Sequence, residues 1–407
     1  MDRYTVISSD CHAAPPMKDF RPYVSAAQRD AFDEWLGWTE QKAAAARRKR
    51  IGGNLFDEDY VKQAEKAEPV ASGGMTGAWD HERRVRELEA DGVAGEVIFP
   101  NGIPFTAPAR STAPVDAALQ LEGVRTYNRW LAELCELAPG RRAGVAVLTV
   151  HDVDAAVETV REASRLGLTG GVLLPQIGEP ISSLPHYNHP RYEPLWQVCE
   201  ELEMPVNAHG GAGPEYGEHP GSLGVYLTEV TFWAHRPFWF LLWSGAFERH
   251  PRLKFVLTEQ TVDWIPSTLE FMDYLYAGPL FAQVRKELSQ KPSEYFARQC
   301  WAGASFMTRI ECEQRQSIGV DRIMFGTDYP HVEGTWPNTA ARLRHTFGGL
   351  PEPEVRAMLG ENAATVYGFD LESLGKIAER VGPDATSIAA GPTEEDLAKN
   401  GKAYLLR

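Results

Sequence analysis

The sequence predicts an α/β protein, built as a (β/α)8 TIM barrel with an N-terminal helical insertion and a peripheral C-terminal tail. Eight short β-rich segments recur along the chain. Their interiors are almost continuously apolar, as in EVIFP, GVLLP and RIMFGTD, which is typical of parallel strands covered on both faces. Amphipathic segments with a period of 3.6 residues lie between them. Together these alternations indicate the β/α repeat of a closed barrel.

The elements follow in a regular order, with two interruptions. We expect strands at residues 4–9, 95–100, 143–150, 170–174, 205–208, 254–258, 301–305 and 322–326. We expect helices at residues 115–137, 153–166, 193–203, 267–276 and 310–318. Residues 20–90 form a charged helical insertion, and the glycine-rich residues 211–230 are predicted to be an active-site loop. The barrel should occupy residues 1–370, and the polar residues 371–407 should form the tail.

Bulk properties exclude some classes of partner. The 407 residues carry a formal net charge of −15, which disfavours nucleic acid and anionic membranes. The five cysteines are scattered without a CxxC pair, which favours reduced thiols in a cytoplasmic protein. The N-terminus reads as a strand without a signal peptide, and no apolar run reaches the roughly 18 residues of a membrane span. We therefore expect a cytoplasmic protein with a small-molecule substrate; a homo-oligomer is left open.

Carboxylate and imidazole side chains follow four of the predicted strands. In a TIM barrel these strand ends form one rim, where active sites lie. Singly, each residue has a structural explanation, such as a helix N-cap or an arginine partner. Together they favour a divalent cation, because burying several unpaired carboxylates would cost several kcal/mol each. The predicted ligands are Asp10, His12, His209, Glu259, Asp328 and His331, with Glu333 as a catalytic or orienting residue.

An aromatic stretch, FWAHRPFWF at residues 232–240, follows the glycine-rich segment. It has two explanations: a helix that packs against the barrel, or an apolar wall for a bulky substrate. On the second explanation Trp233, Arg236 and Trp239 would contact substrate, and His235 would enter the site as a catalytic residue.

The motifs DxH on the first strand, His209 after the fifth and GTDYPH on the eighth resemble the amidohydrolase superfamily. The similar branch contains aminocarboxymuconate semialdehyde decarboxylase and resorcylate decarboxylase, and ENAATVYGFD resembles its closing helix. The resemblance covers about residues 4–370. It implies that Asp10, His12, His209 and Asp328 are the metal ligands.

One position departs from that branch, whose members carry a histidine just after the sixth strand. Here Glu259 stands there, within TEQTVDWIP. This segment and DYPHVEGTWP resemble a smaller group, the TIM-barrel nonheme diiron monooxygenases of platensimycin and platencin biosynthesis. That resemblance implies two Fe ions, O2, an electron donor and a diterpenoid-type substrate carried as an acyl-CoA, whose phosphates Arg236 would meet. The main functional expectation is therefore a diiron monooxygenase of terpenoid metabolism.

Two other functions stay open. The first is a hydrolase or non-oxidative decarboxylase with one Zn or Mn ion, in which Asp328 is the general base and His331 or His235 replaces the missing histidine. The second is a metal-binding scaffold without catalysis. Two irons per chain would favour the oxygenase, whereas one Zn or Mn would favour the hydrolase or decarboxylase.

Overall fold

The computed structural model describes residues 2–50, 74–106 and 116–399, apart from residues 179, 212, 215, 218 and 332 and the side chains of 42–50, 280, 281, 398 and 399. Its parallel strands are β1 (Val6–Ala13), β2 (Val93–Pro100), β3 (Arg142–Gly144), β4 (Ala146–Val147), β5 (Val172–Leu173), β6 (Val206–His209), β7 (Phe255–Thr258), β8 (Cys300–Ser305) and β9 (Ile323–Gly326). They pair in the order β1-β2-β3 and β4-β5-β6-β7-β8-β9. Only Val145 separates β3 from β4, so these two short strands take one place in the barrel.

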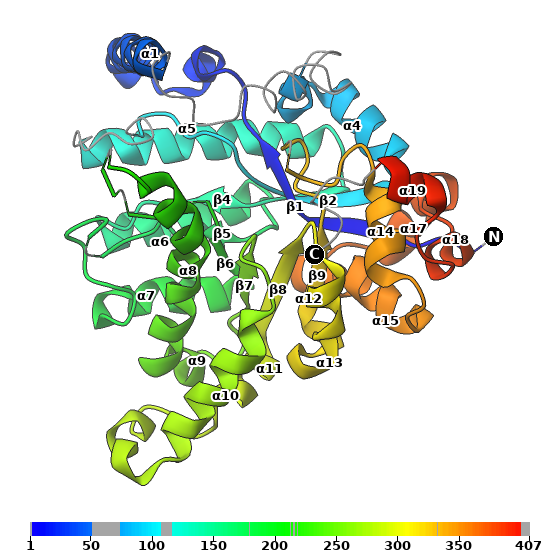
Figure 1. Cartoon of the computed structure of the whole chain (residues 1–407). Coiled ribbons are helices and arrows are strands. Elements are labelled where there is room, and N and C mark those ends of the chain that lie inside the picture. Colours follow the sequence, from blue (N-terminus) through cyan, green and yellow to red (C-terminus); the bar gives the residue numbers. More distant parts are fainter. Residues whose placement is uncertain are drawn as a thin grey trace.

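The barrel closes between its last and first strands. The Asp328 N–H donates to the Asp10 carbonyl over 2.9 Å, and Cys11 forms a parallel bridge with Tyr329. The strands therefore form a ring with helices outside it (Figure 1), which confirms the predicted (β/α)8 class. Predicted metal ligands from both ends of the sequence, Asp10 and Asp328, therefore lie next to each other where the barrel closes.

Helices surround the strands, and several begin at an aspartate. Asp80, Asp116 and Asp152 each accept hydrogen bonds from the first free N–H groups of α4, α5 and α6. The α-helices are α1 (Arg29–Arg50), α4 (His81–Ala90), α5 (Ala117–Glu136), α6 (Val153–Arg165), α7 (Glu193–Glu201), α8 (Ser222–Trp243), α9 (Ala246–Arg249), α10 (Trp264–Ala277), α11 (Pro292–Gln299), α12 (Arg309–Glu313), α13 (Arg315–Ile318), α14 (Thr339–Phe347), α15 (Glu352–Arg356), α16 (Asn362–Tyr367), α17 (Leu371–Val381), α18 (Ala385–Ala389) and α19 (Glu394–Lys399). Short 3-10 or π turns are η1 (Met17–Tyr23), η2 (Ala26–Gln28), η3 (Gly74–Ala78), η4 (Pro190–Tyr192), η5 (Pro279–Arg285), η6 (Val320–Arg322) and η7 (Ala357–Glu361).

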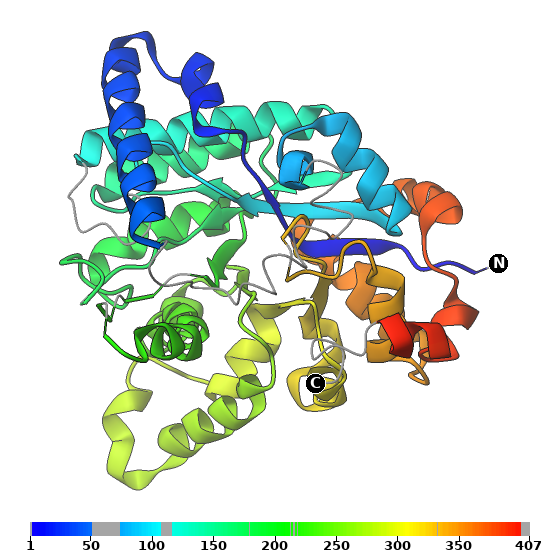
Figure 2. The same cartoon turned by 45° about the horizontal axis from the view of Figure 1, so that its top comes forward.

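The two predicted appendages meet at one place, where Arg380 Nη2 of α17 lies 3.6 Å from Glu89 Oε1 of α4. The insertion predicted at residues 20–90 contains η1, η2, α1, η3 and α4, and its residues 51–73 lie outside the described part. The tail helices α17 to α19 lie near the N-terminus (Figure 2), where Leu374 and Ala378 of α17 are buried. A domain boundary at residue 370 stays a prediction.

Two element boundaries differ from the sequence expectation. β1 runs to Ala13, because its backbone stays paired with β2 as far as the last residue of both strands. Asp10 and His12 therefore lie within a strand rather than after it. The loop predicted at 211–230 ends at Gly221, since α8 begins at Ser222. Among the described residues, no helix is both long and apolar enough to span a membrane.

Candidate metal centre

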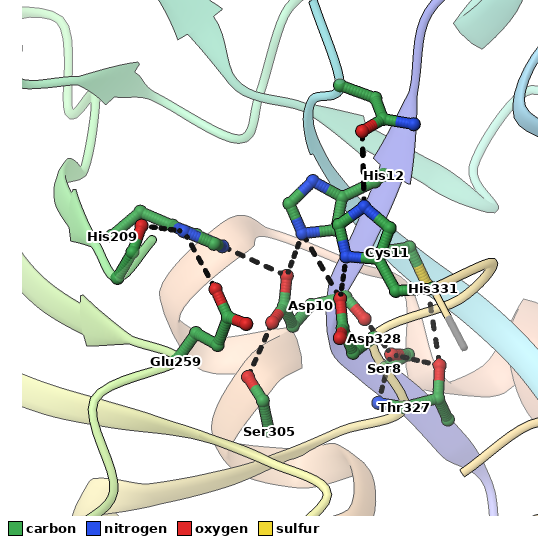
Figure 3. Close-up of polar contacts among 12 residues, drawn as sticks. Ser8, Asp10, Cys11, His12, His209, Glu259, Ser305, Thr327, Asp328 and His331 are labelled. Carbon is green, nitrogen blue, oxygen red and sulfur yellow. Dashed lines mark hydrogen bonds and ion pairs between the residues drawn. The ribbon is translucent and has the colours of Figure 1, made fainter. Parts of the chain in front are cut away.

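All six predicted ligands lie together at the C-terminal ends of the strands (Figure 3). β1 carries Asp10 and His12, β6 ends at His209, Glu259 follows β7, and Asp328 and His331 follow β9. Their ligand atoms form overlapping groups in which all atoms lie within 4.8 Å of one another. These groups are Asp10, His12, His209 and Glu259; His12, Asp328 and His331; and Glu259, Asp328 and Glu333.

Each of the three histidines uses one ring nitrogen to contact a carbonyl oxygen. Carbonyl oxygens only accept hydrogen bonds, so this nitrogen must carry the proton. The other nitrogen of a neutral ring then presents a lone pair, as in metal-ligating histidines. The contacts join His12 Nδ1 to Pro100 O (3.2 Å), His209 Nδ1 to Gly210 O (3.0 Å) and His331 Nε2 to Asn101 Oδ1 (3.1 Å).

The remaining ring nitrogens face carboxylates. His12 Nε2 lies 3.3 Å from Asp10 Oδ1 and 3.2 Å from Asp328 Oδ1. His209 Nε2 lies 3.3 Å from Asp10 Oδ1, and His331 Nδ1 lies 2.8 Å from Asp328 Oδ1. Within the described part of the chain, His12 Nε2, His331 Nδ1 and both Asp328 oxygens are buried without a hydrogen-bond partner. Lone pairs that face one another repel, so protons or a cation must lie between them. Nitrogen and oxygen donors of this kind suit a divalent transition ion.

The pKa shifts of these residues also indicate that the cluster requires protons or a cation. Burial alone would raise the pKa of Asp10, but the His209 and His12 imidazoles hold it well below its ordinary value. Burial opposes the charged form of His12 and His209, yet the adjacent carboxylates raise the pKa of both rings. Burial raises the pKa of Glu259 to about 7, and the Asp10 and Asp328 charges add to that rise while His209 opposes it. A divalent ion would replace the protons that this cluster otherwise holds.

The backbone around the centre adopts uncommon conformations. Glu259 and Asp328 have φ of 55° and 58°, in the left-handed region that non-glycine residues rarely occupy. Such conformations concentrate at functional sites. Gly326 at the end of β9 permits close approach of β1, because a Cβ there would lie 2.8 Å from the Asp10 Cβ.

The two predicted catalytic residues lie in different surroundings. Glu333 is exposed and shares a ligand group with Glu259 and Asp328. His235 is buried on α8, donates from Nε2 to the Gln260 carbonyl over 3.2 Å and stacks on Trp264 with ring centroids 3.8 Å apart. Burial lowers the pKa of His235 to about 4, so the ring is neutral. His235 belongs to none of the ligand groups among the described residues. The catalytic roles of Glu333 and His235 stay predictions.

The predicted substrate contacts lie on α8. The Arg236 guanidinium lies 4.1 Å from the centroid of the Trp233 ring and 5.3 Å from that of Phe240. Trp239 contacts the Phe232 and Trp264 rings. The stretch therefore forms an aromatic cluster, and substrate contact by Trp233, Arg236 and Trp239 stays a prediction.

Three supporting residues were missed by the sequence analysis. Ser305 Oγ donates to Asp10 Oδ2 over 2.5 Å, Asn101 accepts from His331, and the Phe99 ring lies 4.5 Å from that of His209. All three stand at or next to the end of a predicted strand. The strand-end rule that found the ligands could therefore have found these residues, had it been applied to amide, hydroxyl and aromatic side chains.

Comparisons with known proteins identify relatives of this chain. A sequence profile of the amidohydrolase family matches residues 10–369. Gamma-resorcylate decarboxylase of Rhizobium sp. (strain MTP-10005) is 29% identical over 260 residues, 61% of this chain and 76% of the relative. The enzyme of the same name from Rhodococcus jostii (strain RHA1) is 27% identical over 322 residues, 74% of this chain and 94% of the relative.

A solved structure supports the fold. 5-Carboxyvanillate decarboxylase from Novosphingobium aromaticivorans DSM 12444, complexed with manganese and 4-hydroxy-3-methoxy-5-nitrobenzoic acid, superposes with a TM-score of 0.66. The match covers 90% of this chain and 96% of that protein at 15% identity.

These relatives overturn the main functional expectation. They are decarboxylases, so the predicted diiron monooxygenase of terpenoid metabolism is contradicted. Two Fe ions, an acyl-CoA substrate and an electron donor have no support among them, whereas manganese and a small aromatic acid are present in the solved structure. The expectation of a diiron oxygenase rested on Glu259 and the DYPHVEGTWP segment, and the other ligands of this site are compatible with either chemistry. The family profile covers the strands and the site together, and the chain belongs to the amidohydrolase family.

Proposed function

We propose that this protein is a metal-dependent, non-oxidative decarboxylase that acts on an aromatic carboxylate with one Mn²⁺ ion. The observation that carries the proposal is the convergence of buried nitrogen and oxygen atoms without hydrogen-bond partners, from His12, Asp328 and His331. The decarboxylase relatives support the choice of reaction, and the manganese in the solved 5-carboxyvanillate decarboxylase supports the choice of ion.

The residues fit such an ion by their chemistry. Asp10, His12, His209 and Asp328 would hold it, because they offer oxygen and nitrogen donors of the kind that Mn²⁺ accepts. The bound ion would supply Lewis acidity, which orients and polarises oxygen atoms of the substrate. The carbonyl contacts of His12 and His209 fix which ring nitrogen is free, and the Ser305 hydroxyl fixes the Asp10 carboxylate.

The reaction also needs a proton. Decarboxylation replaces a carbon–carboxylate bond by a carbon–hydrogen bond, so one proton enters the ring for each CO2 that leaves. Glu259 is our candidate for its delivery, because its carboxylate lies 3.4 Å from His209 Nδ1 and its side chain is 20% exposed. It also occupies the position at which the resembling branch carries a histidine. We assign Glu259 the role of general acid.

The test combines metal reconstitution with isotope labelling. The protein is stripped with a chelator, reloaded with Mn²⁺ and incubated in D2O with 2,6-dihydroxybenzoate and 5-carboxyvanillate. We expect CO2 release and one deuterium at the carbon that lost the carboxylate, with no reaction by the Asp328→Asn variant. Hydrolysis of aryl esters or amides without CO2 release from either acid would contradict the proposal.

A further inference from the structure

We infer that Arg84 is a positioning residue, whose buried guanidinium fixes the His12 and Asp328 segments relative to each other and thereby sets the metal affinity of the centre. The inference rests on the proposed function, because it assumes that the centre binds an ion. Arg84 lies on α4, outside the strands that carry the ligands, and its side chain is fully buried.

Arg84 contacts the main chain of one ligand directly. Its Nη1 donates to the His12 carbonyl over 2.9 Å and to the Gly77 carbonyl over 3.0 Å. On the other side of the same residue, the His12 N–H donates to the Tyr329 carbonyl over 2.7 Å. The His12 backbone is therefore held from α4 on one side and from the segment after β9 on the other.

Arg84 also packs on the residue that follows Asp328. Its guanidinium carbon lies 5.0 Å from the centroid of the Tyr329 ring, and the Tyr329 hydroxyl donates to Glu87 of the same helix over 2.6 Å. Gly77 allows this packing, because a Cβ there would lie 1.8 Å from the Tyr329 hydroxyl oxygen. The segment from Gly77 to Glu87 thus packs against both ligand-bearing backbones.

The positive charge of Arg84 is neutralised by Glu96, which is not one of the predicted metal ligands. Arg84 Nε and Nη2 donate to the Glu96 carboxylate, at 2.9 Å to Oε1 and 2.7 Å to Oε2. Arg142 Nε donates to Glu96 Oε1 over 3.0 Å, and its Nη1 donates to the Leu134 carbonyl. Arg142 is therefore a matched control: it is buried and binds the same carboxylate, but these hydrogen bonds reach neither ligand segment.

An arginine is suited to this position. Its planar guanidinium donates in several fixed directions at once, so one group can bind a carboxylate and two carbonyls. A lysine supplies the positive charge, but its single ammonium group cannot donate to these three partners in the same fixed directions. Outer-shell partners of metal ligands typically change metal affinity by about 10- to 100-fold when they are removed, and we expect an effect of that size.

The experiment compares two double variants with the same net charge, Arg84→Met/Glu96→Gln and Arg142→Met/Glu96→Gln. Each loses one buried cation and the shared Glu96 carboxylate, and each leaves the other arginine without that carboxylate, so the change in charge is matched between the two variants. Mn²⁺ is titrated calorimetrically into each metal-free protein and into wild type, and the Mn²⁺ EPR spectrum reports the ligand geometry. Circular dichroism and urea unfolding check that both variants fold. Arg84→Lys is a third, less disruptive variant.

We expect the Arg84 double variant to bind Mn²⁺ about 10- to 100-fold more weakly with an altered spectrum, and the Arg142 double variant to stay within about threefold of wild type. Arg84→Lys should restore stability more than affinity. Wild-type affinity in the Arg84 double variant, or an equal loss in both double variants, would overturn this inference alone. Failure of wild type to bind Mn²⁺ would instead overturn the proposed function on which it rests.

Discussion

Two buried charge clusters lie in this protein, and they differ in how their hydrogen bonds are met. In the Glu96 cluster (Glu96, Arg84 and Arg142), both carboxylate oxygens accept hydrogen bonds from arginine N–H groups. In the strand-end cluster, both Asp328 oxygens are buried without a hydrogen-bond partner among the described residues. Glu96 is 2% exposed and Asp328 is 0% exposed, so burial does not distinguish them. A buried carboxylate without hydrogen-bond partners, rather than a buried carboxylate as such, therefore indicates a ligand site.

The largest effect is expected from Asp328→Asn, which removes charge from the unsatisfied cluster. Mn²⁺ binding and decarboxylation should fall by more than about 100-fold, the upper end for outer-shell changes. The metal-free variant should be more stable than metal-free wild type, because burying a neutral amide costs less free energy than burying the Asp328 carboxylate without a hydrogen-bond partner. Calorimetric titration and urea unfolding measure the two quantities. A metal-free variant that is markedly less stable would place Asp328 with the structural carboxylates.

Glu259→Gln sharpens the division of roles inside the strand-end cluster. The amide cannot carry the proton, so kcat should fall by about 10²- to 10⁴-fold, while Mn²⁺ binding stays within a few-fold of wild type. Steady-state kinetics and the Mn²⁺ titration check this together. Loss of the ion in this variant would show instead that Glu259 is a ligand, as the strand-end pattern predicts.

Glu96→Gln tests the satisfied cluster. Removing one partner from a buried ion pair typically lowers the free energy of unfolding by about 3–5 kcal/mol, because Arg84 and Arg142 lose their counter-charge. The variant should still bind one Mn²⁺ per chain, since Arg84 keeps its bonds to the His12 and Gly77 carbonyls. Urea unfolding and metal analysis are the measurements. A stable variant that has lost its ion would reverse the assignment of the two clusters.

The sequence could predict the strand-end ligands but not the Glu96 cluster. The strand-end ligands stand at fixed places after apolar runs, so the strand pattern alone places Asp10, His209 and Asp328 on one rim. Glu96 lies inside an apolar run and Arg84 inside a charged helix, and no local pattern pairs them. The prediction of the substrate class was wrong for another reason. It rested on Glu259, where the resembling branch carries a histidine, and one changed residue does not determine which reaction a site with the same metal ligands catalyses.

Asp91 gives a pH test away from both clusters. Burial raises the pKa of Asp91 to about 7, although hydrogen bonds from the Thr339 N–H and hydroxyl oppose the rise. The folded protein therefore keeps a proton that the unfolded chain has released above pH ~4. The free energy of unfolding should fall as pH rises from about 4 to 7, by at most about 1.4 kcal/mol per pH unit.

The variant Asp91→Asn should lack this contribution. Urea unfolding of wild type and variant at several pH values measures the difference in slope between them. Equal slopes would show that the Asp91 carboxyl is ionised in the folded protein throughout this range.

We propose that one divalent ion binds the atoms of the strand-end cluster that have no hydrogen-bond partner. The most direct measurement is anomalous diffraction at the manganese edge from crystals grown with Mn²⁺. We expect a single strong peak enclosed by His12 Nε2, His209 Nε2, Asp10 and Asp328, at roughly 2.0–2.3 Å from the donor atoms. The absence of a peak there, with the same side chains gathered around water alone, would contradict it.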